Sequence, residues 1–275
     1  MDGPIIGSEQ LAKGLLTRGA LRWNYTAILP DVYVPKGAEL DTWTRAKAAW
    51  LWTGRSGVIA GKTAAALHGA GQVDPADPIE LIARPRRPQP GVIVRNERIE
   101  PDEVDAGRWI TTTAPARTAL DLARRVPLAE AVALLYQLSR VTQVSAADIA
   151  PLEARYRRNR GMGSAYRAIG LMDGGSRSRE ESLLRVALVE RGLPRAQAGI
   201  RIGDEWECYE IGIGWPAARL AVEWGPHRRA LHDDVGFRNL LHRLGWRLIE
   251  AIPQRGTAYI VGECRKVLSA RGLHR

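Results

Sequence analysis

The chain has 275 residues, 45% of them hydrophobic, which is enough for one large domain or two of ordinary size. Its 40 Lys and Arg outnumber 30 Asp and Glu, and the resulting charge of +10 favours a polyanionic partner, most often nucleic acid, over a ribosomal or membrane surface. No apolar run is long enough for a membrane span, no leader pattern opens the chain and the two cysteines form no CxxC pair. We therefore expect no membrane partner, no signal peptide and no zinc cluster, and a cytoplasmic location.

Residues 1–40 are predicted to form a winged helix-turn-helix. Ser8 can cap a first short helix that runs to about Leu15 or Leu16, and a second short helix runs from Thr17 to about Asn24. The segment "AILPDVYVPKG" then has the pattern of a small β-hairpin. In a winged helix the second helix enters the major groove of DNA, and the hairpin contacts the backbone or the minor groove.

The predicted DNA contacts of this region lie on or beside the second helix and after the hairpin: Arg18, Arg22, Trp23, Asn24 and Lys36. Arginine suits guanine and asparagine suits adenine, while a lysine contacts phosphates. The competing interpretation is a small structural helical cap, in which Trp23 belongs to the hydrophobic core.

Residues 41–172 are predicted to form an α/β middle region. "DTWTRAKAAWLWTG" has apolar residues at helical spacing after a capping Asp41, and we expect its tryptophans in the core. "RSGVIAGKTAAALHGA" resembles a phosphate-binding loop, but Ser56 stands where that motif needs a glycine. A helix that starts at Gly61 is the better interpretation, and His68 near its end is expected to be structural.

Strands are predicted in "IELIAR" and "GVIVRNERI", and the arginines of the loop "PRRPQPG" between them either approach phosphates or lie on a solvated hairpin tip. "WITTTAPARTALDLARRV" starts as a strand and becomes an amphipathic helix, and "PLAEAVALLYQLSRV" forms another. Residues 144–174 continue helically and carry the densest basic cluster of this region, Arg155, Arg157, Arg158 and Arg160. This cluster either contacts the DNA backbone or is a solvated helix end.

Residues 173–275 are predicted to form a third part, because the Gly- and Ser-rich segment "MDGGSRSREES" separates regions of different organisation. The predicted order of elements is αβββαβα, which is common to restriction-type nucleases. The fold class is therefore α/β (α+β), with an N-terminal winged helix, an α/β middle region and a restriction-endonuclease-like C-terminal domain.

This third part resembles the Vsr-like endonuclease domain of actinobacterial proteins, a branch of the PD-(D/E)xK nucleases. The similarity is carried by "ESLLRVAL", "YEIGIGWPAARLAVEWGPH" and "DVGFRNLLHRLGW". The matching positions are Glu181, Trp215, Pro216, Glu223, His227, Asp234, Asn239, Gly245 and Trp246. The resemblance implies a site in which carboxylates hold Mg²⁺ or Mn²⁺ for DNA cleavage.

The metal ligands that the resemblance implies are Glu181 and Glu223, with His227 beside them. Two acids of the family pattern are absent, because Gly212 and Gly225 occupy their positions. The remaining carboxylates hold Mg²⁺ poorly, since octahedral coordination depends on charged oxygen ligands. The alternative roles are a salt bridge for Glu223 and a hydrogen-bonded turn for His227.

One carboxylate can substitute for the missing strand aspartate. Glu210 precedes Gly212 by two residues, so strand alternation predicts that both face the same side, about 7 Å apart along the strand. A rearranged catalytic site would then consist of Glu181, Glu210, Glu223 and His227.

Residues 5–150 resemble AbiEi-type antitoxin proteins in "DVYVPKG", "KTAAALHGA" and "TTAPARTALDLARR". This resemblance implies a winged helix that binds operator DNA and represses its own operon, with a nucleotidyltransferase toxin as the cognate partner.

Three functions remain open. The first is a transcriptional regulator or antitoxin-like protein that binds double-stranded DNA in the nucleoid, with a catalytically impaired nuclease-fold domain and no cofactor. The second is a DNA endonuclease with a rearranged site that uses Mg²⁺ or Mn²⁺. The third is an interaction module that only binds a toxin, which leaves the charge of +10 unexplained unless the partner is acidic.

Overall fold

A computed structural model describes residues 3–71, 74, 76–84, 87–107, 109–172, 178–225 and 231–273. The chain divides into two compact units: unit 1 comprises Met1–Arg125 and Arg140–Met162, and unit 2 comprises Val126–Ser139 and Gly163–Arg275. Both units combine helices with β-sheets, which confirms the α+β class. The division into 1–40, 41–172 and 173–275 stays a prediction. Of the helices described, none has the length and hydrophobicity that a membrane span requires.

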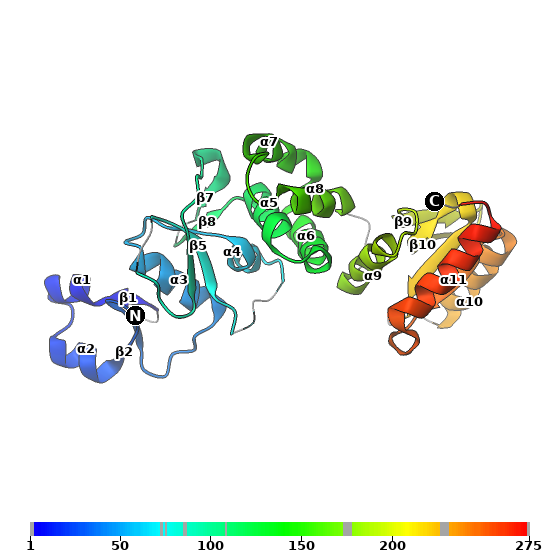
Figure 1. The fold of residues 1–275 in the computed structure, drawn as a ribbon. Helices are drawn as coiled ribbons and strands as arrows, with labels where there is room; N and C mark the ends of the chain where they lie inside the picture. Colours follow the sequence, from blue (N-terminus) through cyan, green and yellow to red (C-terminus); the bar gives the residue numbers. More distant parts are fainter. Residues whose placement is uncertain are drawn as a thin grey trace. The chain divides into compact units, whose positions relative to one another are not determined.

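Unit 1 begins with two short helices and a hairpin, drawn in blue in Figure 1. These elements are β1 (Ile5–Ile6), α1 (Gly7–Ala12), α2 (Arg18–Asn24), β2 (Tyr25–Leu29) and β3 (Val32–Pro35). The strands form an antiparallel sheet in the order β1-β3-β2, and α3 (Thr42–Trp52) packs against all three. The predicted order of two helices followed by a hairpin is confirmed.

The start of α1 corrects one prediction. Its N-cap is Ile6, which offers no side-chain oxygen, and Ser8 lies inside the first turn. The hydroxyl and the amide of Ser8 instead donate to the carboxylate of Asp31 in the β2–β3 turn, the amide at 2.9 Å. Ser8 therefore ties α1 to the hairpin.

Other helix ends follow local signals. α1 stops at Ala12, before the predicted end at Leu15 or Leu16. Gly14 then adopts a φ of +65°, a left-handed conformation common just beyond a helix end. Asp41 caps α3 as predicted, because its carboxylate accepts a 2.7 Å bond from the amide of Thr44.

The tryptophans of α3 differ in their surroundings. Trp50 and Trp52 pack against the hydrophobic core, as expected. Trp43 is 38% exposed, so the expectation is wrong for this residue. It lies in the first turn of the helix, before the face formed by the buried Ala46 and Ala49 begins.

A five-stranded mixed sheet forms the centre of unit 1 in the order β6-β5-β4-β8-β7. Its strands are β4 (Val58–Ile59), β5 (Ile79–Ile82), β6 (Val92–Arg95), β7 (Val104–Ala106) and β8 (Thr111–Thr113). The helices α4 (Gly61–Leu67) and α5 (Pro115–Arg125) pack against each other, and α3 contacts β5. Small and branched apolar side chains fill the core: Ala46, Ala49, Ile59, Ala64, Ile79, Leu81 and Ile110.

Two interpretations of the α4 region are confirmed. The helix starts at Gly61, whose φ is +58°, and its N-cap residue is Ala60. His68 at the end of the helix is structural, since its Nε2 lies 2.8 Å from the carbonyl oxygen of Thr113 in β8.

The predicted helical stretch 144–174 is interrupted. α7 (Ala146–Tyr156) begins with a capping box formed by Ser145 and Asp148, and five residues separate its end from the start of α8 (Met162–Leu171). Between them Gly161 has a φ of +86°, and a Cβ there would lie 2.5 Å from the carbonyl oxygen of Arg124. Only glycine suits this turn.

Unit 2 contains most of α6 (Leu128–Thr142) and the predicted αβββαβα order, which is confirmed. The elements of the αβββαβα order are α9 (Arg179–Glu190), β9 (Gln197–Gly203), β10 (Cys208–Trp215), β11 (Leu220–Trp224), α10 (Leu231–Arg243), β12 (Arg247–Ala251) and α11 (Gly256–Ala270). The sheet order is β12-β11-β10-β9, with β12 parallel to β11 and the other pairs antiparallel.

Two clusters cover the two faces of this sheet. Phe237 and Leu240 of α10 pack on Ala221, whereas α9 and α11 pack on the opposite face, where Val222 points. The sheet is therefore enclosed by helices on both sides, and its edges are β9 and β12.

Candidate functional site

The outer side of α2, together with Lys36, is the first candidate site, here called the α2 surface. Leu21 is 7% exposed and anchors the helix, whereas Arg18, Arg22 and Asn24 are exposed and Trp23 is 73% exposed. Trp23 therefore does not belong to the core, and the alternative of a helical cap with a buried tryptophan is wrong in that respect.

The hairpin brings Lys36 beside the end of α2. The amide of Lys36 donates a 2.9 Å hydrogen bond to the carbonyl of Asn24. All five residues predicted from the sequence as DNA contacts of this region thus lie on α2 or directly beside its end. The α2 surface has three cations, Arg18, Arg22 and Lys36. None of them forms an ion pair with any residue that the structure describes.

Two contacts fix the first helix against the rest of unit 1. Arg55 donates two hydrogen bonds to the carboxylate of Glu9, at 2.5 and 2.7 Å, and the bonds from Arg55 lower the pKa of Glu9. The second contact is the bond pair from Ser8 to Asp31, whose φ of +61° places it in the hairpin turn. These contacts hold the helices and the hairpin in one arrangement.

The basic cluster at the end of α7 divides into two kinds of residue. Arg155 donates to the carboxylate of Asp102 at 2.9 Å and also to Glu103, so its charge is already paired. Arg157, Arg158 and Arg160 are exposed. In Figure 1, α7 and α2 lie at opposite ends of unit 1, so the predicted contacts form two separate groups.

The loop between β5 and β6 faces a cavity of about 640 Å³. This cavity is lined by Pro30 of the β2–β3 turn, by Trp52 and by the described part of the loop, Arg87, Pro88, Gln89 and Pro90. The loop is therefore near the hairpin rather than an isolated tip. Arg86, the other arginine of this loop, lies outside the described residues.

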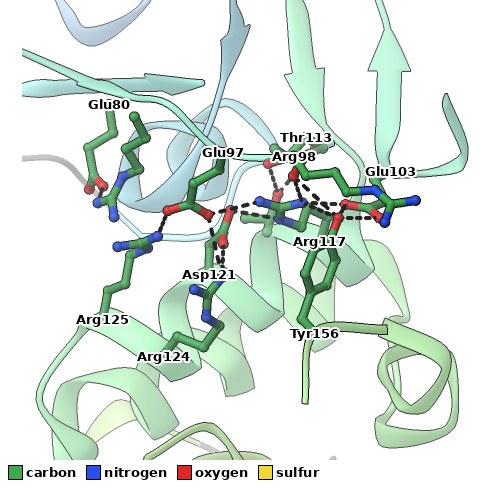
Figure 2. A network of polar contacts seen from close by, with 12 residues as sticks. Glu80, Glu97, Arg98, Glu103, Thr113, Arg117, Asp121, Arg124, Arg125 and Tyr156 are labelled. Carbon is green, nitrogen blue, oxygen red and sulfur yellow. Dashed lines mark hydrogen bonds and ion pairs between the residues drawn. The ribbon is translucent and has the colours of Figure 1, made fainter. Parts of the chain in front are cut away.

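A buried ionic network, which the sequence did not indicate, joins α5, α7 and the segment 97–103 (Figure 2). Its centre is Arg117, whose side chain is fully buried and whose guanidinium contacts Glu103, Glu97 at 3.2 Å and Asp121 at 3.1 Å. Burial alone would lower the pKa of Arg117, but the charges of Asp121 and Glu103 outweigh it and raise the pKa.

Tyr156 closes the network from α7. Its hydroxyl donates to the carboxylate of Glu103 at 2.8 Å, and burial together with this bond raises the pKa of Tyr156 to about 12. Arg124 reaches the carbonyl of Arg160 at 3.2 Å. Each of these contacts joins protein groups to one another, so the network holds segments together. The one signal in the sequence is the spacing of Arg117 and Asp121, an i,i+4 ion pair on a helix that is buried along most of its length.

The residues of the nuclease-like site lie in different surroundings in unit 2. Glu181 is buried in the first turn of α9, where the amide of Glu181 donates to Ser178 Oγ at 3.2 Å. Glu223 on β11 is partly buried, and its Oε1 accepts a 2.8 Å bond from the amide of Gly212 on β10. Glu210 is exposed, and His227 lies outside the described residues.

Strand alternation does not carry through Gly212. Ile211 packs in the cluster under α10, whereas Ile213 packs in the cluster under α9 and α11. Regular alternation therefore does not place Glu210 on the same side of the sheet as Gly212. Within the described ranges, no group of three or more His, Cys, Asp or Glu residues could hold a metal ion. Glu181 and Glu223 as metal ligands stay a prediction.

Comparison with known proteins supports part of these expectations. Residues 56–173 match the family model of the AbiEi antitoxin C-terminal domain, which confirms the predicted resemblance for these residues. Two uncharacterized proteins of Mycobacterium tuberculosis, MT2308 and Rv2248, are each 30% identical over 148 residues, which cover 51% of this chain and 54% of theirs. The chain thus spans about half the length of the curated relatives it matches.

A solved structure is also similar, the crystal structure of the RV2827C protein from Mycobacterium tuberculosis. It is 18% identical, with a TM-score of 0.42 over 74% of this chain and 84% of that chain. The Vsr-like character of residues 173–275 stays a prediction.

Proposed function

We propose that this protein is a DNA-binding, antitoxin-like transcriptional regulator that uses the α2 surface to contact double-stranded DNA. The observation that carries the proposal is the presentation of Arg18, Arg22, Trp23 and Asn24 on one exposed helix, with Lys36 beside its end. The match of residues 56–173 to an antitoxin domain and the net charge of +10 agree with it.

The chemistry of the α2 surface suits duplex DNA. A seven-residue helix followed by a hairpin can place its exposed side in a major groove, with the hairpin against the backbone. Arg22 and Asn24 carry the fork and amide donors that read guanine and adenine, and Lys36 supplies a charge for a phosphate. Trp23 offers a flat apolar ring that can lie against sugars or bases.

The C-terminal part of unit 2 is proposed to have a nuclease fold that does not hydrolyse DNA. The support is chemical: the position of the missing strand acid is Gly212, and the amide of that glycine occupies one oxygen of Glu223. A carboxylate engaged in this way has lost part of its capacity for a metal ion, which hard oxygen ligands must surround.

A gel-shift experiment tests DNA binding. The probe is a duplex that carries the region directly upstream of this protein's own gene, and a shuffled duplex of equal length serves for comparison. Arg22→Ala is expected to weaken binding of the upstream duplex by roughly 5- to 150-fold, which corresponds to about 1–3 kcal/mol for one base contact. Each lost phosphate contact also makes the slope of the logarithm of the binding constant against the logarithm of the salt concentration shallower by about one unit.

The control variant is Arg167→Ala, because Arg167 is exposed on a helix of unit 2 and also forms no ion pair with the described residues. Equal binding by wild type, Arg22→Ala and Arg167→Ala at two salt concentrations would contradict the assignment of α2. Co-purification with the product of the neighbouring open reading frame tests the proposed toxin partner separately.

A further inference from the structure

A small charged cavity lies at the open edge of the unit 2 sheet, between α10, β12 and α11. Its volume is about 160 Å³, and the charged residues that line it are Arg238, Arg247, Arg255, Glu250 and Glu263. The remaining lining comes from Tyr259 and from Leu248 and Ile249 of β12. Pockets for drug-sized ligands measure roughly 300–1,000 Å³, so this cavity suits one small group.

The charges of the cavity do not cancel. Glu250 is paired with Arg238, and Glu263 is paired with Lys266 at 2.8 Å, so each carboxylate already has a cation. Arg247 and Arg255 form no ion pair with any residue in the ranges that the structure describes. Arg247 and Arg255 also attract Glu263 electrostatically, but three arginines face two carboxylates in the lining. A net positive charge therefore remains beside a cavity that is the right size for a single anion.

The strand edge adds donors of another kind. β12 is the last strand of the sheet, and the amide of Arg247 points to β11, since it donates to the carbonyl of Arg219 at 2.8 Å. Backbone groups alternate along a strand, so the amides of Leu248 and Glu250 point to the open edge. Within the described ranges these two amides have no hydrogen-bond partner, so they can bind an anion that the neighbouring arginines attract.

Arg255 is held in place by an aromatic ring. Its guanidinium carbon lies 5.6 Å from the ring centroid of Tyr259, one turn further along α11, in a cation–π contact. The ring limits the freedom of the side chain but leaves its donors available. Guanidinium groups bind phosphate oxygens with two parallel hydrogen bonds, which makes phosphate the anion of choice.

From this arrangement we infer that the cavity beside β12 binds a single phosphate group, through Arg247, Arg255 and the edge amides of β12. The group comes either from the backbone of bound DNA or from a small phosphorylated molecule. The site lies in a different unit from the α2 surface and does not depend on the function proposed for that surface.

The first arm of the test uses inorganic phosphate and the full chain. Arginine Nε–Hε resonances are followed by NMR while phosphate is added, with chloride at matched ionic strength as the reference. The Arg247 and Arg255 signals are expected to shift saturably with phosphate and not with chloride. The Arg247→Gln/Arg255→Gln double variant should abolish binding, whereas Arg201→Gln on the opposite edge strand should retain it.

The second arm identifies the source of the phosphate. If DNA supplies it, the double variant binds two duplexes of unrelated sequence several-fold more weakly than Arg201→Gln does, by the same factor for both. If a small molecule supplies it, DNA affinity is equal in the two variants while inorganic phosphate still saturates the site. The inference is overturned if phosphate gives no saturable shift and the double variant binds DNA as Arg201→Gln does. A loss of DNA binding by Arg22→Ala alone bears on the α2 surface and leaves this result unchanged.

Discussion

The amide of Lys36 donates to the carbonyl of Asn24, so the end of the β2–β3 hairpin is fixed to the last residue of α2. This bond joins two residues that are twelve positions apart in the chain, so the helix and the end of the hairpin form one surface. Beside it, Trp23 projects into solvent with 73% of its surface exposed.

Replacement of Trp23 by alanine is expected to weaken DNA binding several-fold without changing the fold. An exposed side chain away from the core contributes within about ±0.5 kcal/mol to the free energy of unfolding. Thermal unfolding and gel shifts measure the two quantities on the same sample. Trp206→Ala is the matched control, since Trp206 is 87% exposed in unit 2. An equal loss of DNA affinity in both variants would contradict a specific role for Trp23.

Replacement of Arg117 by alanine is expected to lower the free energy of unfolding by about 3–5 kcal/mol, because it leaves Glu103 and Asp121 buried without their main cation. The control is Arg98→Ala, which removes a pair with Glu100 in which the arginine side chain is 72% exposed. Exposed pairs contribute about 0–1 kcal/mol. Urea denaturation measures both, and a cost below about 1 kcal/mol for Arg117→Ala would show that the network adds little.

The order of elements was predictable to a large extent, because most helices and strands carry their own signal. The αβββαβα order of unit 2 follows from period-2 runs such as "ARLAVEW" and from amphipathic helices, and it is confirmed. The short strands β4 and β7 escaped prediction, since two or three residues cannot show a period. Ser8 was misassigned because the bond to Asp31 joins residues that only the hairpin brings together.

The functional residues were predictable only where they lie close together in the sequence. Arg18, Arg22, Trp23 and Asn24 belong to one helix, so helical spacing alone gathered them. Arg155 looked like part of a surface cluster, but its partner Asp102 is 53 residues away in the chain. The buried network around Arg117 and the cavity beside β12 depend on contacts between distant segments, which a single sequence does not reveal.

Asp102 makes the stability of the fold depend on pH. Its hydrogen bonds from Arg155 lower its pKa below the ordinary 3.8, so the pair stabilises the fold above that pH, and this contribution is lost as the pH falls through the lowered value. Asp102→Asn should therefore lose less stability than wild type when the pH falls from about 5 towards 2. Thermal unfolding over this range measures the difference, and parallel curves would contradict the role of the pair.

Gly61 is expected to resist substitution for a reason other than nucleotide binding. Its φ is +58°, and an added Cβ would lie 2.5 Å from Glu80 Oε2. A left-handed conformation costs an alanine about 1–2 kcal/mol, and the contact adds to this cost. Gly163→Ala is the control, because it is helical and a Cβ there meets nothing within 4 Å. Gly61→Ala should lower the melting temperature and Gly163→Ala should not; equal melting temperatures would refute the strain.

The purified protein is expected not to cut DNA in Mg²⁺ or Mn²⁺, because of the surroundings of Glu223. One oxygen of Glu223 accepts a hydrogen bond from the amide of Gly212, the position at which the nucleases that this part of the chain resembles carry an acid. At Gly225, the position of the second missing acid, the Cβ of any side chain would lie 2.6 Å from Ile252 Cγ2. Neither position supplies the charged oxygen that a divalent ion needs beside Glu223. A supercoiled plasmid, incubated with either ion and with EDTA as control, measures cleavage. Nicking by wild type that stops with EDTA and in Glu223→Gln would replace the non-hydrolysing nuclease fold proposed for unit 2 with an active endonuclease.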